Sequence, residues 1–140
     1  MNAKILSKLK DRTLFGLEGR TALITGGGQG IGLSIARGFA YAGANVSICD
    51  VNMETATQQS ELLNRELNSN ISIPIHADVS KSADIAQMID RTVKEFGRMD
   101  IAVNNAGTQG QLVPFPVCRI THYVFEWARL MDFVCIQNVH

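Results

Sequence analysis

Apolar runs and helix-patterned segments alternate along most of this chain. Short runs rich in Ile, Val and Ala lie at 20–25, 45–50, 71–77 and 99–104, and each has the length of one strand. Strands that alternate with helical patterns of about 10–15 residues indicate βαβ units. The pattern therefore predicts an α/β protein with a parallel sheet.

The segments between these strands carry apolar residues at helical spacing. We expect three helices, at 30–42, at 53–67 and from a cap at Ser80 or Ser82 to Phe96. Asn52 can accept the first N–H groups of the second helix. Gly43 and Gly97 fit the left-handed position that ends a helix. Each predicted helix thus has at least one boundary signal.

The third predicted strand contains a proline. Pro74 has no N–H to donate to a neighbouring strand, so its strand is expected at a sheet edge. In a doubly wound sheet of order 3-2-1-4-5-6 the third strand is such an edge. The proline supports this strand order independently of the hydrophobic pattern.

The regular alternation stops after the fourth strand. Residues 108–118 are expected to form a loop, and 121–138 a helix that is apolar around most of its circumference and needs burial on all sides. The sheet would then be incomplete after the fourth strand, whose outer edge would be exposed. Such an edge invites pairing in a homo- or hetero-oligomer.

The glycine-rich turn after the first strand is the most informative chemical feature. Residues 25–32 read Thr-Gly-Gly-Gly-Gln-Gly-Ile-Gly and lie between a strand and a helix. This arrangement presents backbone N–H groups and the positive end of a helix dipole to a phosphate. Glycine is needed where a Cβ would keep a pyrophosphate from the backbone. The turn predicts that the chain binds a dinucleotide.

An acidic residue ends the second strand, eighteen residues after Gly32. The Asp50 carboxylate can accept hydrogen bonds from adenosine ribose hydroxyls and repels a 2′-phosphate. Since Gln29 is uncharged and Val51 and Asn52 follow the acid, no basic residue offers a phosphate clamp. NAD is therefore favoured over NADP, with a solvated strand end or a cap as the alternative interpretation of Asp50.

Two further strand ends carry candidate residues. Asp78 and Val79 follow the third strand on the ligand side of such a sheet, but a helix N-terminal charge is an equally good interpretation of Asp78. Residues 104–107, Asn-Asn-Ala-Gly, end the fourth strand beside the glycine turn. Small residues let the backbone approach a ligand there, and an asparagine side chain can bridge two strands; an ordinary Asn/Gly turn is the alternative.

The composition narrows the classes of function. Thirteen basic and 13 acidic side chains in 140 residues give no electrostatic reason to expect a nucleic acid or an acidic membrane as partner. Three cysteines without metal-ligand spacing indicate reduced thiols, and so a cytoplasmic protein without a metal site. No apolar run reaches the roughly 20 residues of a membrane span. A solvated leader at 1–16 is favoured over a mitochondrial presequence because of Asp11.

Together these segments resemble the short-chain dehydrogenase/reductase family over residues 14–107. The glycine turn matches that family's motif, and 104–107 matches its second hallmark. The resemblance implies a Rossmann-like doubly wound sheet, NAD(P) as cofactor and reversible hydride transfer between an alcohol and a carbonyl. It implies cofactor contacts by Gly26, Gln29, Gly30, Ile31, Gly32, Asp50, Asp78, Val79, Asn105, Ala106 and Gly107.

The family's catalytic residues have no counterparts here. Its chemistry uses a Tyr-x-x-x-Lys pair, in which the tyrosine moves the hydroxyl proton, together with a serine and an asparagine. The two tyrosines, Tyr41 and Tyr123, are followed four residues later by Asn45 and Trp127, and neither serine nor lysine occurs after residue 94. We therefore expect no catalytic site, and no activity, in this chain alone.

The sequence thus predicts a leader at 1–16, a dinucleotide-binding Rossmann half at 17–110 and a divergent tail, loop plus helix, at 111–140. The alternatives are a non-enzymatic NAD-binding or interaction module, and a truncated gene product. The substrate stays open.

Overall fold

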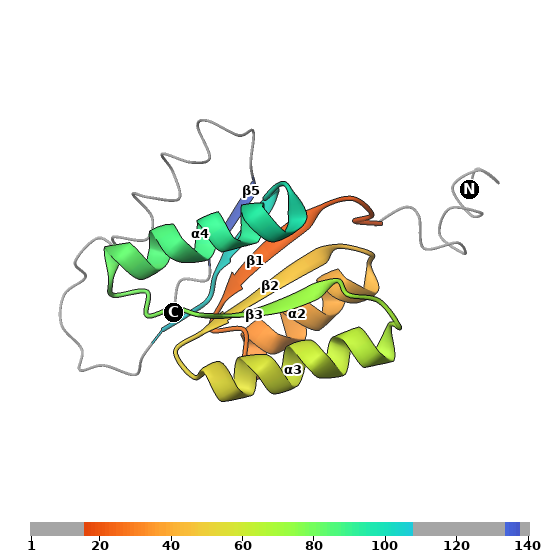
Figure 1. Ribbon diagram of the computed structural model, residues 1–140, viewed down its shortest axis with the longest axis horizontal. Coiled ribbons are helices and arrows are strands. Elements are labelled where there is room, and N and C mark those ends of the chain that lie inside the picture. Colours follow the sequence, from red (N-terminus) through yellow and green to blue (C-terminus); the bar gives the residue numbers. More distant parts are fainter. Residues whose placement is uncertain (1–15, 108–133, 138–140) are drawn as a thin grey trace.

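The computed structural model describes residues 16–107 and the backbone of 134–137. Eight elements follow one another along the chain (Figure 1): β1 (Thr21–Thr25), α2 (Gly30–Tyr41), β2 (Asn45–Asp50), α3 (Met53–Glu66), β3 (Ser72–His76), α4 (Ser82–Phe96), β4 (Ile101–Asn104) and β5 (Val134–Gln137). None of the helices in the described part of the chain is long and apolar enough to cross a bilayer.

The strands form one parallel sheet of order β3-β2-β1-β4-β5. Ala22 in β1 pairs with Val46 in β2 on one side and with Ile101 in β4 on the other. Because crossovers between parallel strands need a helix, each βα connection places a helix against the sheet. The predicted fold class, an α/β Rossmann-like doubly wound sheet, is confirmed.

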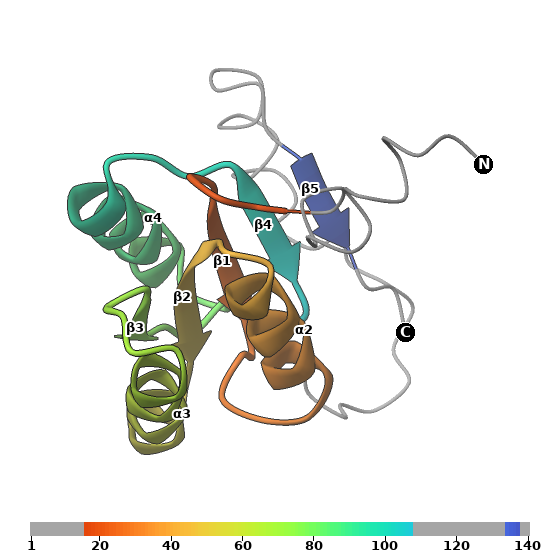
Figure 2. The same ribbon diagram turned by 90° about the vertical axis from the view of Figure 1, so that its right-hand side faces the viewer.

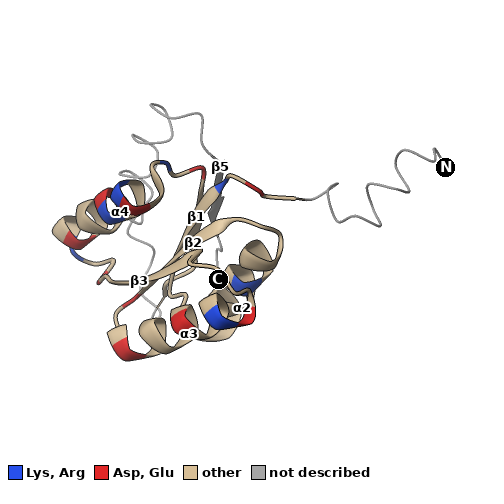
Figure 3. Cartoon of the chain, turned by 45° about the vertical axis from the view of Figure 1, so that its right-hand side comes forward, with Lys and Arg blue, Asp and Glu red and all other residues tan. Residues whose placement is uncertain are grey.

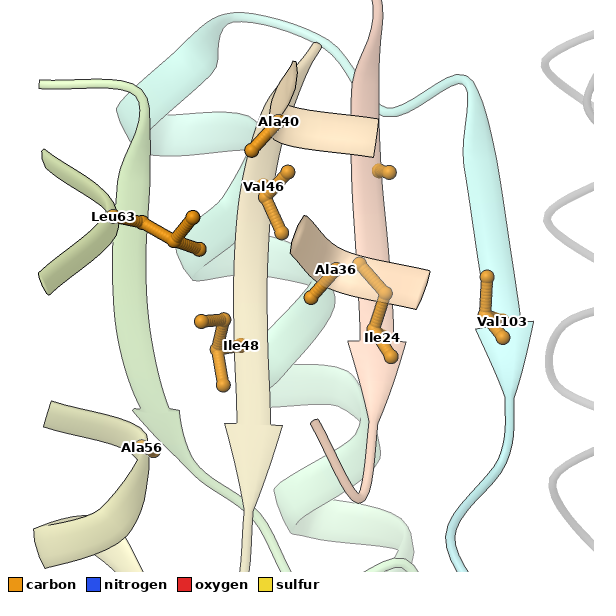
Figure 4. Packing of buried hydrophobic residues seen from close by; sticks show 9 residues of the cluster. Ile24, Ala36, Ala40, Val46, Ile48, Ala56, Leu63 and Val103 are labelled. Carbon is orange, nitrogen blue, oxygen red and sulfur yellow. The ribbon is translucent and has the colours of Figure 1, made fainter. Parts of the chain in front are cut away.

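Helices cover both faces of the sheet. Figure 2 shows α2 and α3 on one face and α4 on the other. Successive strand residues point to opposite faces, so in β1 Leu23 belongs to the core cluster under α4 and Ile24 to the cluster under α2 and α3. Figure 4 shows Ile24, Ile48 and Leu63 in the second cluster. Burial on both faces explains the continuous apolar runs of these strands.

Charged side chains lie mainly on the outer surfaces of the helices. Acidic and basic residues are interspersed on α3 and α4 (Figure 3). Acidic residues outnumber basic ones on these two helices. The described surface therefore adds no electrostatic case for a nucleic acid.

The predicted helix boundaries hold with one exception. Asn52 caps α3, and Gly97 ends α4 at a φ of +77°. The expected cap of α4 at Ser80 or Ser82 is wrong, because the N-cap is Lys81 and has no side-chain hydrogen bond. The Ser80 hydroxyl instead donates to the Asp78 carboxylate at 2.7 Å.

Strand β3 is an edge strand, as Pro74 predicts. The backbones of Ile71 and Ala77 bond to β2, through Val46 N–H to Ile71 O and Ala77 N–H to Asp50 O. Pro74 lies at the alternate position, where its missing N–H costs no ladder bond. On this outer side of β3, the backbone N–H and C=O groups of Ser72 are hydrogen-bonded to the side chain of Asn64.

The tail differs from its prediction where the structure describes it. Residues 134–137, expected in a helix over 121–138, form strand β5 and pair in parallel with β4, with Val134 opposite Ile101. The β4 edge that was expected to be exposed is therefore paired. The physical reason is that the N–H and C=O groups of a strand edge form hydrogen bonds with a second strand. The rest of the expected loop and helix, and residues 1–15 of the leader predicted at 1–16, lie outside the described residues.

Candidate functional site

The candidate site lies at the carboxyl ends of β1, β2 and β4. The glycine turn leaves β1 in the left-handed region at Gly26 (φ +62°) and enters α2 through Gly30 (φ +56°). A Cβ on Gly26 would be 3.0 Å from Ala106 Cα, and one on Gly32 only 2.2 Å from Gly26 O. These glycines are required because turn, helix and the 104–107 segment lie in direct contact.

Gly30 is glycine for another reason. A Cβ on Gly30 would have no heavy atom within 4 Å, so a side chain would not clash there. Glycine is favoured instead by the positive φ, which other residues rarely adopt. Gly107 likewise has open space around it, and Ile31 is 56% exposed. This side of the turn is therefore open.

Asn105 joins β4 to β1. Its side-chain amide donates to Thr25 O at 3.1 Å and to Gly26 O at 3.2 Å. In return the Thr25 hydroxyl accepts the backbone N–H groups of Asn105 and Ala106, both at 3.1 Å, and donates to Val103 O. The predicted bridging role of an asparagine is confirmed, and it fixes the shape of the turn.

The first turns of α2 and α3 differ in how their N–H groups are satisfied. Helix α2 has no side-chain cap at Gln29 and no acidic residue in its first turn. Helix α3 has both, because Asn52 Oδ1 accepts from Glu54 N and Thr55 N and Glu54 is acidic. The first turn of α2 therefore has backbone N–H groups without a side-chain cap, and together with the positive end of the helix dipole these can bind an anion.

Asp50 lies beside the glycine turn. It is 8% exposed, and its Oδ2 accepts the Gly28 N–H at 2.9 Å while Oδ1 accepts the Asn52 N–H at 2.9 Å. A Cβ on Gly28 would be 2.9 Å from Asp50 Oδ2 and 2.7 Å from Thr55 Oγ1. The carboxylate is held in one orientation and keeps further lone pairs as acceptors.

Asp78 begins the segment before α4. Its carboxylate accepts the Ser80 hydroxyl and N–H and lies 3.3 Å from Lys81 Nζ. The hydrogen bonds from Ser80, with the Lys81 charge, hold the pKa of Asp78 below its ordinary value. Val79 packs on the core cluster under α4. The local partners of Asp78 agree with the interpretation as a charge at a helix start, and its contact with a cofactor stays a prediction.

The structure brings four of the eleven predicted residues into direct contact: Gly26, Gly32, Asn105 and Ala106. Gly28 and Thr25 were missed as functional positions, although both stand in the glycine motif. A buried hydroxyl at the end of an apolar strand was the available signal for Thr25. Among the described residues, no group of three His, Cys, Asp or Glu could hold a metal ion.

These features fit a dinucleotide. The open Gly30 position leaves room for a phosphate against the backbone, the uncapped α2 offers donors to it, and Asp50 offers acceptors to hydroxyls. Fold and site together define a Rossmann-type nucleotide-binding domain.

Comparisons with known proteins narrow this class. The family model for short chain dehydrogenases matches residues 20–132. The 3beta-hydroxysteroid dehydrogenase 2 of Eggerthella lenta is 42% identical over 116 residues, which are 82% of this chain and 42% of that protein. The chain belongs to the short-chain dehydrogenase/reductase family, whose fold binds NAD(P).

Two solved structures share the fold. The 3-ketoacyl-(acyl-carrier-protein) reductase of Brucella melitensis, complexed with NADH, has a TM-score of 0.61 and 36% identity, covering 71% of this chain and 41% of that one. The RhlG/NADP active-site complex of Pseudomonas aeruginosa has a TM-score of 0.58 and 40% identity, covering 67% and 37%. The matched part of this chain thus spans about two fifths of the length of these three proteins.

Proposed function

We propose that this chain is the cofactor-binding part of an NAD(H)-dependent oxidoreductase that interconverts an alcohol and a carbonyl. The observation that carries the proposal is the uncapped first turn of α2 beside the open glycine turn. The nicotinamide of the bound dinucleotide supplies or accepts the hydride in this chemistry. The chain's own residues bind and orient it.

The eleven predicted residues divide the work of binding. The segment from Gly26 to Gly32 offers backbone donors to the diphosphate, and Asp50 accepts from the adenosine ribose. Asp78 and Val79 border the same ligand from β3, and Asn105, Ala106 and Gly107 from β4. The contacts of Thr25 and Asn105 with the turn support this assignment, because they hold its backbone in one conformation.

The preference for NAD(H) rests on Asp50. Its carboxylate is fixed by two backbone N–H groups, so a negative charge stays beside the glycine turn. A ribose hydroxyl can donate to it, whereas a 2′-phosphate meets like charge without compensation.

We propose further that the 140 residues bind cofactor without turnover. Tyr41 does not suit proton transfer to a substrate, because it lies in the last turn of α2, at the opposite end from the glycine turn. Its hydroxyl donates to Glu66 Oε2 at 2.7 Å, and this bond raises the pKa of Tyr41. A catalytic tyrosine needs the opposite shift. A non-enzymatic NAD-binding module is the matching alternative, and a cytoplasmic location is proposed for either.

Titration calorimetry tests the proposal on the purified chain. We expect saturable binding of NADH, weaker binding of NADPH and no turnover with a panel of polyols and ketones. Gly30→Ala should weaken NADH binding, because a Cβ enters the open side of the turn at a positive φ. Gly38→Ala adds the same group in open space on α2 and controls for the change in helix composition. No binding of NADH by folded protein at millimolar concentration would overturn the proposal.

A further inference from the structure

The N-terminus of α3 borders the Asp50 carboxylate. Asn52 N–H donates to Asp50 Oδ1 at 2.9 Å, and Thr55 Oγ1 and Asp50 Oδ2 both flank the position of a Cβ on Gly28. The site is therefore bounded by two helix N-termini, that of α2 at the glycine turn and that of α3 at the ribose-binding acid.

Only the first of these two helix ends is left open to an anion. In α3 the Asn52 side-chain oxygen accepts from Glu54 N at 3.1 Å and from Thr55 N at 3.2 Å. The Thr55 hydroxyl is also engaged, since it donates to Asn52 O at 2.9 Å. Glu54 adds a negative charge to this first turn.

We infer that Asn52 is a second determinant of dinucleotide choice, acting with Asp50 against a 2′-phosphate. A phosphate beside Asp50 needs donors to replace its water, and the first turn of α3 is a local source of them. Asn52 removes those donors by accepting them itself. This inference rests on the proposed function, because it places the adenosine ribose at Asp50.

The consequence is that removal of the Asp50 charge alone does not create a good NADP(H) site. With Asp50→Asn the repulsion disappears, but the N–H groups of Glu54 and Thr55 stay bonded to Asn52. If Asn52 is replaced as well, these two N–H groups become free to donate to the phosphate, which also lies at the positive end of the α3 dipole. The two substitutions should therefore act on NADPH affinity more than additively.

Four variants of the 140-residue chain test this: Asp50→Asn, Asn52→Gly, the double variant, and Asp50→Asn with Asn52→Ser. Glycine at an N-cap costs the helix little stability, and serine keeps an acceptor at the cap. Affinity for NADH and NADPH is measured by calorimetry, with thermal melts to verify folding.

We expect the double variant to bind NADPH about three- to thirtyfold more tightly than Asp50→Asn. The Asn52→Ser version of the double variant should bind NADPH no better than Asp50→Asn, because its cap is intact. Asn52→Gly alone should leave NADPH excluded by the Asp50 charge.

Equal NADPH affinity of the double variant and Asp50→Asn, in a parent chain that binds NADH, would overturn this inference alone. The same holds if the glycine and serine versions gain affinity equally. A parent chain that binds neither nucleotide would instead overturn the proposed function.

Discussion

Gly32 in α2 lies so close to Gly26 that a Cβ on Gly32 would be 2.2 Å from the Gly26 carbonyl oxygen. The same Cβ would be 2.5 Å from Asn105 Nδ2, which donates to that oxygen. The absence of a side chain at Gly32 thus allows α2, the glycine turn and the segment after β4 to come into direct contact. The shape of the candidate site depends on this contact.

Gly32→Ala should therefore disrupt the site. The methyl group meets backbone atoms that cannot move independently, so we expect a loss of about 1–3 kcal/mol in the free energy of unfolding and loss of NADH binding. Urea unfolding and calorimetry measure the two effects. Gly38→Ala, exposed on the same helix, should instead stabilise the chain by about 0.5–1 kcal/mol. Equal stability of both variants would contradict the contact.

Thr25→Val should destabilise the chain although it conserves shape. The Thr25 hydroxyl accepts two backbone N–H groups, from Asn105 and Ala106, and the residue is fully buried. Valine removes the acceptor of the Ala106 N–H, at a cost of about 1–3 kcal/mol, whereas the Asn105 N–H keeps the Val103 carbonyl oxygen at 3.1 Å. Thr25→Ser retains the hydroxyl and should recover most of that stability in chemical denaturation. A Thr25→Val variant as stable as the parent chain would contradict the role of the hydroxyl.

Asp100 should make folding stability depend on pH at acid values. Partial burial alone would raise its pKa, but hydrogen bonds from Arg98, Thr21 N–H and Arg20 outweigh burial and hold the pKa below its ordinary value of 3.8. A carboxylate with a lowered pKa in the folded state contributes stability above 3.8, and that stability is lost as pH falls through the folded pKa.

Urea unfolding at neutral pH and at about pH 3 measures this contribution. Asp100→Asn should reduce the loss of stability between the two pH values. Asp90→Asn removes one carboxylate from an exposed position of α4 and controls for net charge. An unchanged pH dependence in Asp100→Asn would refute the assignment.

Asn64→Ala should weaken the β3 edge. The Asn64 side chain accepts from Ile71 N and Ser72 N and donates to Ser72 O, so it occupies the outer side of the strand as a neighbouring strand would. We expect a loss of about 1–3 kcal/mol in stability and, because the edge is uncovered, more self-association in analytical ultracentrifugation. Gln58→Ala, at an exposed hydrogen bond of the same helix, is the control. Unchanged stability in Asn64→Ala would contradict this role.

The sequence alone determined the elements from β1 to β4 and their order. Helical and strand periodicity depend on residues close together in the chain, and so do the Asn52 cap and the Gly97 helix end. Pro74 indicated an edge because a missing N–H limits any strand that contains it. The glycine turn predicted a dinucleotide for the same local reason, because a few adjacent residues decide whether a ligand can reach the backbone.

Only the tertiary structure decided how the site is held together. The Thr25–Asn105 network joins residues 80 positions apart, and Gly28 meets Asp50 across 22. The strand at 134–137 also depends on a partner, β4, and not on its own apolar pattern, which predicted a helix. Such contacts form only when the sheet brings distant strand ends to one edge, and no local spacing in the sequence encodes them.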